Sequence, residues 1–338
     1  MSYKLLLDIS KDLIIYAIIA HGKLIKKGYV KYIRSDDPDR IAGVLIKEMY
    51  DLHPQKIFFP GGILKPNSSD YFIVNKNMYD DVKNHVYGKS KYNYLTAVAY
   101  LIAEKFQISA ISVKPLSLDN LKSLNRINGM ENIAKFSRYH ACQQSATCLY
   151  CERVLGKRCD DMNIIITYIG NKTSIGAYLK GKCVDVNDAY GAEGPMGFTS
   201  SGDVPIHPFV ERIIGEKLDI NAIEKLLFSQ SGLSKYHVKN AVDADKLYDK
   251  DENIKIAIEA LAYQVSKYIG SAAISLNGQV DAIVICGEGA KSERIVELIK
   301  SRVQFLGQVL VFGEFEIMRY LGYVSEIVGT KLYPVTKY

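Results

Sequence analysis

The sequence predicts an α/β protein of two domains that share one plan, and three observations lead to this fold class. The chain has 338 residues, which is more than one hydrophobic core usually supports. Residues 5–25 align without a gap on residues 164–184, at a constant offset of 159 positions. After each block, helix and strand patterns alternate. Similarity at a single long spacing indicates a duplicated domain rather than a short solenoid repeat.

The first half is expected to begin with three strands. Residues 5–25 contain two apolar stretches around a polar corner at residues 8–12, then a turn at His21-Gly22-Lys23 and a third apolar stretch. Apolar residues at helical spacing then predict helices, and short apolar runs predict buried strands. The helix, strand, helix and strand expected next cover residues 38–52, 56–59, 95–106 and 109–113.

The second half repeats this pattern. Its three strands occupy residues 164–184, with a corner at residues 168–172 and a turn at Gly181-Lys182 that matches Gly22-Lys23 of the first half. Helical composition precedes the strands, and a long helix and two further strands follow them. These helices cover residues 132–156 and 254–276, and the strands cover residues 281–286 and 308–312.

A meander followed by alternating helices and strands, twice over, is typical of actin-like (ribonuclease H-like) domains. Two such domains are expected to enclose an interdomain cleft for ligands. We assign residues 1–122 and 318–338 to an N-terminal domain, and residues 123–317 to a C-terminal domain.

The composition is that of an ordinary cytoplasmic protein. Hydrophobic residues make up 48% of the chain and charged residues 24%. No apolar run is long enough to span a bilayer, and the chain leads from Met1 into a strand rather than into a signal peptide. The net charge of +6 is spread out, without a basic tail or an aromatic-basic motif. We therefore expect neither a membrane nor a nucleic acid as partner.

Four cysteines lie close together in the sequence, at Cys142, Cys148, Cys151 and Cys159. The spacing of Cys148 and Cys151 is that of metal or iron–sulfur ligands. The surrounding segment has helical spacing, however, and a helix would point Cys142 and Cys148 to different sides. A cysteine-cluster metal protein is therefore one alternative, and small buried thiols in a reducing compartment are the other.

The corners at the strand ends are the candidate ligand sites. In this architecture a hairpin tip can bind phosphate through its backbone N–H groups, and glycine there leaves room for the phosphate. The first corner has no glycine and two acids, Asp8 and Asp12, which would repel a triphosphate unless a cation intervened. The second corner keeps a glycine and gains Lys172. The candidate nucleotide-binding residues are Gly170 and Asn171 of the second corner, and Gly287, Glu288 and Gly289 of a third.

Several longer motifs extend over essentially the whole chain in one register. The motifs are Gly61-Gly62-Ile-Leu-Lys65-Pro66, Gly181-Lys-Cys-Val-Asp185-Val-Asn187-Asp188, Glu193-Gly194-Pro195, Gln230-Ser231-Gly232-Leu233 and Gly278-Gln-Val-Asp281. Together they resemble the butyrate kinases of the acetokinase family.

This resemblance implies the reaction and the residues that would perform it. The family transfers phosphate between ATP and a short-chain carboxylate such as butyrate, with magnesium, and forms an acyl phosphate. His140 and Glu314 are the catalytic positions that the chain keeps, and Glu314 would lie near the metal. Five catalytic positions are altered: Asp8, Pro60, Lys114, Tyr168 and Ser200. Asp119, an acid of the family's Asp-Pro segment, survives.

The altered positions leave three interpretations open. Pro60 and Ser200 stand where the family has arginines, and a single transition-state arginine can contribute roughly 10³ or more in rate. The chain would then be a weak or inactive pseudokinase, pairing with itself or with an active paralogue. Alternatively it is an active carboxylate kinase in which Lys114 and Lys172 return positive charge to the site. The third interpretation is the cysteine-based metal protein.

Overall fold

The computed structural model describes residues 2–10, 12–33, 37–313, 316–331 and 333–338. The chain divides into two compact units, which comprise Met1–Asp119 with Glu316–Tyr338, and Asn120–Phe315. From the sequence, the first segment of unit 1 was expected to end at residue 122 rather than 119, and its second segment to begin at residue 318 rather than 316. In the described part of the chain, no helix combines the length and the apolar character that crossing a bilayer needs.

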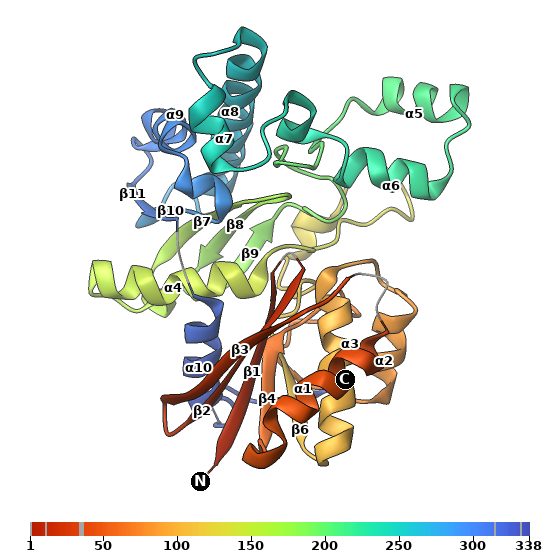
Figure 1. The fold of residues 1–338 in the computed structure, drawn as a ribbon. Helices are drawn as coiled ribbons and strands as arrows, with labels where there is room; N and C mark the ends of the chain where they lie inside the picture. The colour runs from red at the N-terminus through yellow and green to blue at the C-terminus, as the bar shows by residue number, and fades with distance from the viewer. Residues whose placement is uncertain (1, 11, 34–36, 314–315, 332) are drawn as a thin grey trace. The chain divides into compact units, whose positions relative to one another are not determined.

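Unit 1 is a seven-stranded sheet with helices on both faces, in the strand order β12-β5-β6-β4-β1-β2-β3. Helices α1 and α3 cover one face of the sheet and α10 covers the other (Figure 1). The strands are β1 Tyr3–Ser10, β2 Leu13–Ala20, β3 Lys23–Lys31, β4 Lys56–Pro60, β5 Tyr71–Ile73, β6 Ser109–Val113 and β12 Thr336–Lys337. The helices are α1 Pro38–Met49, extended by the 3-10 turn η1 Tyr50–Leu52, then α2 Lys76–Lys83, α3 Lys91–Phe106 and α10 Ile317–Ile327.

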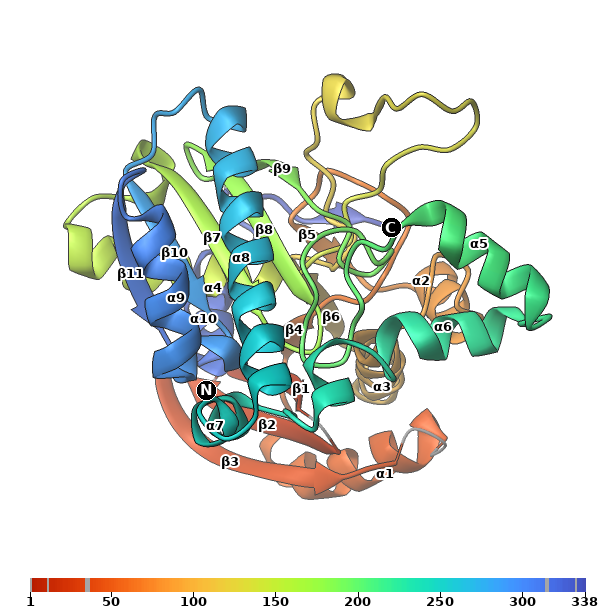
Figure 2. The ribbon, with the colours of Figure 1, turned by 90° about the horizontal axis from the view of Figure 1, so that it is seen from above.

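Unit 2 is a five-stranded sheet in the order β11-β10-β7-β8-β9. Helices α8 and α9 cover one face and α4 lies on the other (Figures 1 and 2). The strands are β7 Asn163–Ile169, β8 Thr173–Leu179, β9 Lys182–Val186, β10 Ala282–Cys286 and β11 Gln308–Phe312. The helices are α4 Ala141–Leu155, α5 Ile206–Gly215, α6 Ile220–Phe228, α7 Ala241–Leu247, α8 Glu252–Ser275 and α9 Glu293–Val303, and the 3-10 turns are η2 Ser123–Arg126, η3 Cys159–Asp161, η4 Gly232–Tyr236 and η5 Glu288–Lys291.

The two sheets share one topology, which confirms the two actin-like domains. The order β11-β10-β7-β8-β9 in unit 2 corresponds to β6-β4-β1-β2-β3 in unit 1. In unit 1, β1 pairs antiparallel with β2 and parallel with β4. In unit 2, β7 pairs antiparallel with β8 and parallel with β10. In each unit the parallel neighbour follows a connection that contains a helix. Parallel neighbours place their carboxyl ends at the same edge of the sheet, where ligands of open α/β sheets bind.

The duplication extends to an irregularity in the hairpins. The pairing of β2 with β3 shifts register between Ile18 and Ile19, and the pairing of β8 with β9 shifts between Ala177 and Tyr178. These two sites are separated by the same 159 positions as the sequence repeat. A bulge bends a strand and increases its local twist, so both meanders bend at the same place.

The turns that follow the second strands also correspond. His21 and Gly22 have φ angles of 49° and 71°, and Lys180 and Gly181 have φ angles of 47° and 78°. Two consecutive residues with positive φ form the tight hairpin turn whose twist matches that of the strands, and glycine tolerates this conformation without steric cost. The glycine of each matching turn is therefore explained by backbone geometry alone.

Three helix starts differ from those expected, and α8 begins only two residues early, at Glu252. Helix α3 begins at Lys91 rather than at residue 95, because the Ser90 side chain accepts a hydrogen bond from the Tyr92 N–H (3.2 Å) and caps the helix. Helix α4 begins at Ala141 rather than at residue 132. Residues 127–140 have no regular structure, because their basic side chains are held by carboxylates of another loop.

Candidate functional site

The second corner is the turn that joins β7 to β8. The strands pair up to Ile169 and Thr173, and the Gly170 N–H donates to the Lys172 carbonyl at 3.2 Å to close the turn. Both strands are buried along almost their whole length. This rigid apolar hairpin therefore holds the turn at the carboxyl end of β7, where the sequence placed it.

A second segment, the loop between β9 and α5, lies directly on this turn. The Phe198 N–H donates to the Gly170 carbonyl at 2.9 Å, and the Ser200 N–H donates to the Asn171 carbonyl at 3.0 Å. A methyl group at Gly197 would lie 2.4 Å from the Asn171 carbonyl oxygen, so only glycine allows this approach. The structure thus brings together three residues that the sequence singled out, Gly170, Asn171 and Ser200.

His140 and Tyr168 lie side by side at this corner. Their rings are stacked with centroids 4.0 Å apart, and the Tyr190 ring lies 5.6 Å from His140. His140 is 7% exposed, and its Nδ1 shares a hydrogen bond of 2.9 Å with the Ser174 hydroxyl. Gln144 also donates to that hydroxyl, at 3.0 Å. The stacked Tyr168 ring and the Ser174 hydroxyl together hold the imidazole of His140 in one orientation.

The Tyr168 ring fills the space between the second and the third corner. A methyl group at Gly170 would lie 2.8 Å from Tyr168 Cε1, and a methyl group at Gly287 would lie 3.1 Å from Tyr168 Cε2. The aromatic ring therefore occupies the room that both glycines leave beside the backbone. In a phosphate-binding turn that room would receive the ligand.

Lys172, the last residue of the turn, directs its ammonium group at aromatic rings. Its Nζ lies 3.5 Å from the centroid of the Phe228 ring and 5.3 Å from that of Tyr190. A cation over the face of an aromatic ring is attracted by the ring's quadrupole. Phe228 is the last residue of α6, so the lysine ties this helix to the turn.

The third corner begins directly after β10. Gly287 has a φ angle of 86° and starts the turn η5. A methyl group at Gly289 would lie 2.4 Å from Ile169 Cγ2, so this glycine is required for packing against the end of β7. Glu288 accepts a hydrogen bond from the Ala241 N–H at 3.3 Å and thereby holds the start of α7. Because β7 and β10 are parallel neighbours, the second and third corners meet.

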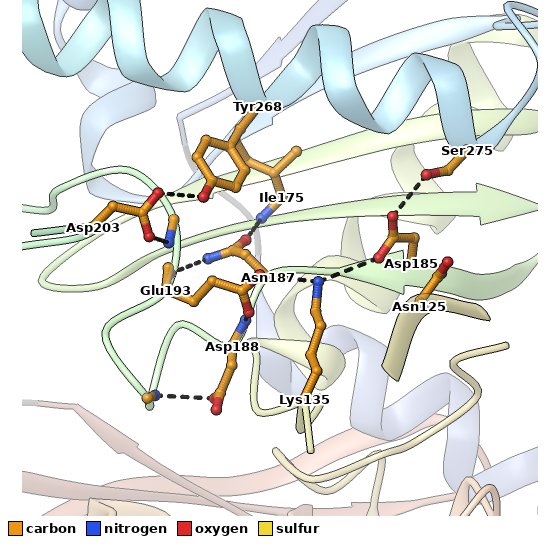
Figure 3. A network of polar contacts seen from close by, with 12 residues as sticks. Asn125, Lys135, Ile175, Asp185, Asn187, Asp188, Glu193, Asp203, Tyr268 and Ser275 are labelled. Carbon is orange, nitrogen blue, oxygen red and sulfur yellow. Dashed lines mark hydrogen bonds and ion pairs between the residues drawn. The ribbon is translucent and has the colours of Figure 1, made fainter. Parts of the chain in front are cut away.

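A polar network holds the loop between β9 and α5 in place (Figure 3). Asn187 is its centre: the side-chain oxygen accepts from the Ile175 N–H at 2.7 Å, and the side-chain nitrogen donates to the Glu193 carbonyl at 2.7 Å. Lys135 Nζ lies 3.0 Å from the Glu193 carboxylate and 3.6 Å from that of Asp185. Burial lowers the pKa of Lys135, but Glu193 and Asp185 outweigh it, so the pKa is raised.

Arg138 and Asp188 form a second ion pair of this loop. The guanidinium donates to both carboxylate oxygens, at 2.9 and 2.6 Å, which is the bidentate geometry that arginine favours. Burial raises the pKa of Asp188 above its usual value, while Arg138 opposes that shift. Next to the pair is a pocket of about 290 Å³, lined mainly by residues 125–136 with Asp188 and Glu193.

The first corner lies in unit 1. Asp8 is half-buried in β1, and its Oδ1 is a buried oxygen with no hydrogen-bond partner in the described part of the chain. Burial raises the pKa of Asp8, although the charge of Lys91 opposes this. Lys91 Nζ donates to the Ile9 carbonyl at 2.7 Å. A lysine that the sequence did not single out therefore stands at this corner.

Two further predicted positions are also in unit 1. Pro60 ends β4 beside Val113, and Lys114 follows directly after β6. Lys114 Nζ lies 2.6 Å from the Asp70 carboxylate, and the Lys114 N–H donates to the Asp70 carbonyl at 2.7 Å. Asp70 therefore balances at least part of the positive charge that Lys114 was expected to add to a ligand site. Asp119 is buried, and its N–H is bound to the Asn67 carbonyl.

The remaining predicted positions are the expected metal ligands. Glu314, the expected magnesium ligand, lies outside the described residues. Helix α4 runs unbroken past Cys142, Cys148 and Cys151. Among the residues that the structure describes, no three His, Cys, Asp or Glu side chains are grouped as metal ligands. Burial raises the pKa of Cys151, which favours inert thiols over metal-binding thiolates.

Sequence reasoning missed several residues of the site. Lys135 and Arg138 are separated by about 50 residues from the carboxylates that they bind, and Phe228 is equally far from Lys172. The only signal was the presence of two basic residues shortly before His140. Such a pattern is also typical of an exposed surface, so it could not identify partners.

Comparison with known proteins shows which family the chain is similar to. The model of the acetokinase family matches residues 133–313. Butyrate kinase 1 of Clostridium acetobutylicum is 33% identical over 257 residues, which cover 75% of this chain and 72% of that protein.

Solved structures show the same fold. The acetate kinase of Porphyromonas gingivalis has a TM-score of 0.75 at 16% identity, covering 96% of this chain and 99% of that one. A propionate kinase from Francisella tularensis also has a TM-score of 0.75, at 17% identity, covering 95% and 99%. At these identities the likeness concerns the fold alone.

Proposed function

The chain belongs to the acetokinase family, and we propose that it is a butyrate kinase-like protein with a degenerate site. It would transfer phosphate between ATP and a short-chain carboxylate such as butyrate weakly or not at all. The Tyr168 ring is the observation that carries this proposal, since it fills the space over Gly170 and Gly287. A phosphate could approach these glycines only if the ring moved away.

The charges at the altered positions of each unit support the same proposal. Phosphoryl transfer depends almost wholly on positioning and on neutralising negative charge, and one arginine can contribute roughly 10³ or more in rate. Pro60 and Ser200 carry no charge. Lys114 is paired with Asp70, and the Lys172 ammonium faces Phe228 and Tyr190. Neither lysine replaces an arginine, because an ammonium lacks the planar fork of a guanidinium.

Magnesium with ATP is the proposed cofactor. The buried Asp8 Oδ1 lacks a hydrogen-bond partner among the described residues, and carboxylate oxygens are the ligands that magnesium prefers. Asp8 therefore fits a cation within unit 1. Separately, Glu314 is proposed as the magnesium ligand from the family resemblance. When bound, a magnesium ion would neutralise negative charge of the phosphate.

The proposed partners follow from the family. They are ATP or ADP and a short-chain carboxylate where activity remains, and a second copy of the chain or an active paralogue. We propose the cytoplasm as the location. Neither a nucleic acid nor a membrane is proposed as a partner.

Calorimetry with the full chain tests the degenerate site. ATP and ADP are titrated with and without magnesium, and we expect weak binding that magnesium changes little. Tight, magnesium-dependent ATP binding would contradict the proposal. A coupled assay with acetate, propionate, butyrate and branched acids, with Mg-ATP, is expected to show little turnover.

An active kinase with rearranged groups is the second candidate. Two observations favour it: His140 is held in one orientation by Ser174, and Lys91 brings a cation to the first corner. In that case the coupled assay shows turnover that Glu314→Ala abolishes. The matched control is Glu297→Ala on the exposed side of α9, which should leave turnover unchanged.

A further inference from the structure

Three cysteine thiols lie close together where the end of α4 meets the turn η3. Cys148 and Cys151 are one helical turn apart on α4, and Cys159 is the first residue of η3. The Cys159 Sγ donates to the Cys148 carbonyl at 3.4 Å, and the two side chains also hydrogen-bond with each other. All three are free thiols in the structure. Phosphoryl transfer gives none of them a role, and they belong to no metal-ligand group among the described residues.

The turn η3 is held firmly against the helix. The Cys159 N–H donates to Glu152 Oε1 at 2.9 Å, and the Met162 N–H donates to the Cys159 carbonyl at 3.1 Å. The Gly156 N–H, which donates to the Glu152 carbonyl at 2.9 Å, ends the helix between them. Glu152 follows Cys148 by four positions on α4, so the two side chains lie on the same face of the helix. The contact that fixes η3 therefore also places Cys159 beside Cys148.

The two sulfur atoms differ in their access to solvent. Cys159 is 7% exposed, whereas Cys148 is only half-buried. The hydrogen bond with Cys148 and burial raise the pKa of Cys159, so Cys159 keeps its proton. Exposure and thiolate character decide which cysteine an oxidant meets first. Cys148 is therefore the thiol that an oxidant in solution reaches, and Cys159 is the neighbour that can react with the product.

We propose that Cys148 and Cys159 form a reversible disulfide when the chain meets hydrogen peroxide. Cys148 loses its proton to solvent, and its thiolate attacks one peroxide oxygen. The O–O bond breaks, and the departing hydroxide is protonated to water, which leaves a sulfenic acid on Cys148. The Cys159 sulfur then attacks the Cys148 sulfur, and the Cys159 proton leaves with the hydroxyl group as a second water. Two thiols are oxidised to one disulfide, and one peroxide is reduced to two waters.

The disulfide would link two elements that lead to the second corner. Its cysteines are 11 positions apart. Helix α4 begins directly after His140, and β7, which follows η3, ends at Ile169. A disulfide stabilises a folded chain mainly by restricting the unfolded chain, so oxidation would fix α4 to the segment before β7. In a reducing compartment such a bond is transient. The proposal does not rest on the proposed loss of phosphoryl transfer.

Peptide mapping of the full chain by mass spectrometry tests the proposal. The native reduced chain is treated with hydrogen peroxide, alkylated, and cleaved by trypsin after Lys and Arg. The disulfide should join the peptide of residues 139–153 to that of residues 159–172, with a mass lower by two hydrogen atoms. Dithiothreitol should separate them. Cys142 and Cys151 should carry the alkyl group, which assigns the bond to Cys148. Absence of the joined peptides, or a bond through Cys142 or Cys151, would overturn the proposal.

Variants of the same helix provide the matched control. Cys148→Ala should abolish the joined peptides, whereas Cys142→Ala with Cys151→Ala should keep them at the wild-type yield. Circular dichroism checks that both variants keep their helix content.

A second measurement needs no variant. Iodoacetamide should alkylate Cys148 of the native reduced chain at least ~10-fold faster than the fully buried Cys151, because access controls thiol reactivity. Equal alkylation rates, or joined peptides that persist in Cys148→Ala, would contradict the role of Cys148 as the thiol that peroxide attacks.

Discussion

The rings of His140 and Tyr168 are stacked 4.0 Å apart, with an angle of 23° between their planes. Such contacts between aromatic rings typically contribute ~0.5–1.5 kcal/mol beyond the area they bury. His140 is itself held by Ser174, so the stack keeps the Tyr168 ring over the two glycine corners. His140 thereby supports the side chain that fills the space beside Gly170 and Gly287.

Removing this ring and the neighbouring lysine should reopen the corner. We expect Tyr168→His with Lys172→Gly to bind ATP at least tenfold more tightly than the wild-type chain, which corresponds to ~1.4 kcal/mol. The reason is that the smaller imidazole restores room beside Gly170 and Gly287, while Lys172→Gly returns the glycine that the family resemblance implies at the end of this corner. Isothermal titration calorimetry with Mg-ATP measures the change.

The control for this double variant uses another lysine–tyrosine pair. Lys267 Nζ lies 5.7 Å from the Tyr263 ring on α8, and Tyr263 is largely exposed. Tyr263→His with Lys267→Ala should leave ATP binding unchanged. Equal affinities of the two double variants would show that Tyr168 does not limit binding.

Replacing Asp8 by its neutral isostere should stabilise the chain. Asp8 Oδ1 is buried without a hydrogen-bond partner in the part of unit 1 that the structure describes, and burying such a charged oxygen costs free energy. We expect Asp8→Asn to raise the free energy of unfolding by ~1 kcal/mol at pH 7. Urea unfolding measures this change in the free energy of unfolding. The control is Asp12→Asn, at the exposed end of the same corner.

The pH dependence of the free energy of unfolding provides a second test of the Asp8→Asn prediction. Burial raises the pKa of Asp8 from 3.8 in the folded state. The folded chain then binds the proton more tightly than the unfolded chain, so the contribution of Asp8 to stability is present below pH 3.8 and is lost as the pH rises through the raised pKa. Asp8→Asn should abolish this part of the pH dependence. A variant that keeps the wild-type profile would exclude Asp8 as its source.

Lys114 and Asp70 should be coupled in stability. Their charged groups are 2.6 Å apart and partly exposed, and such pairs contribute ~0.5–1 kcal/mol. We expect Lys114→Asp, which restores the acid of the family, to destabilise the chain, and Asp70→Asn to restore part of the loss. A double-mutant cycle by urea unfolding gives the coupling energy. A coupling energy of zero would mean that Asp70 does not neutralise Lys114.

Asn187 should be essential for the loop that lies on the second corner. It is 3% exposed and bonds with Ile175 and Glu193. Asn187→Ala leaves these buried groups without partners, so we expect a loss of ~2–3 kcal/mol in the free energy of unfolding. The exposed Asn221→Ala of α6 should change it by less than ~0.5 kcal/mol. Equal effects of the two substitutions would contradict a structural role of Asn187.

Much of the fold could be predicted because its signals are local. The strands at residues 109–113 and 308–312 have the predicted bounds, since a short apolar run between polar segments identifies a buried strand. The start of α4 could not be predicted in this way. Residues 132–140 have helical composition, but Lys135 and Arg138 bind carboxylates about 50 residues away, and these contacts hold the segment in an irregular conformation.

The sequence by itself determined that two actin-like domains are present, since residues 5–25 and 164–184 repeat at an offset of 159 positions with the same Gly-Lys turn. From the family resemblance it also predicted which corner positions are altered. The tertiary structure alone decided what the replacing side chains do: Tyr168 stacks on His140, Lys172 faces Phe228, and Lys114 binds Asp70. The physical reason is that strand periodicity and turn geometry are determined by residues that are neighbours in the sequence. The environment of a charge or a ring depends on residues that only folding brings near.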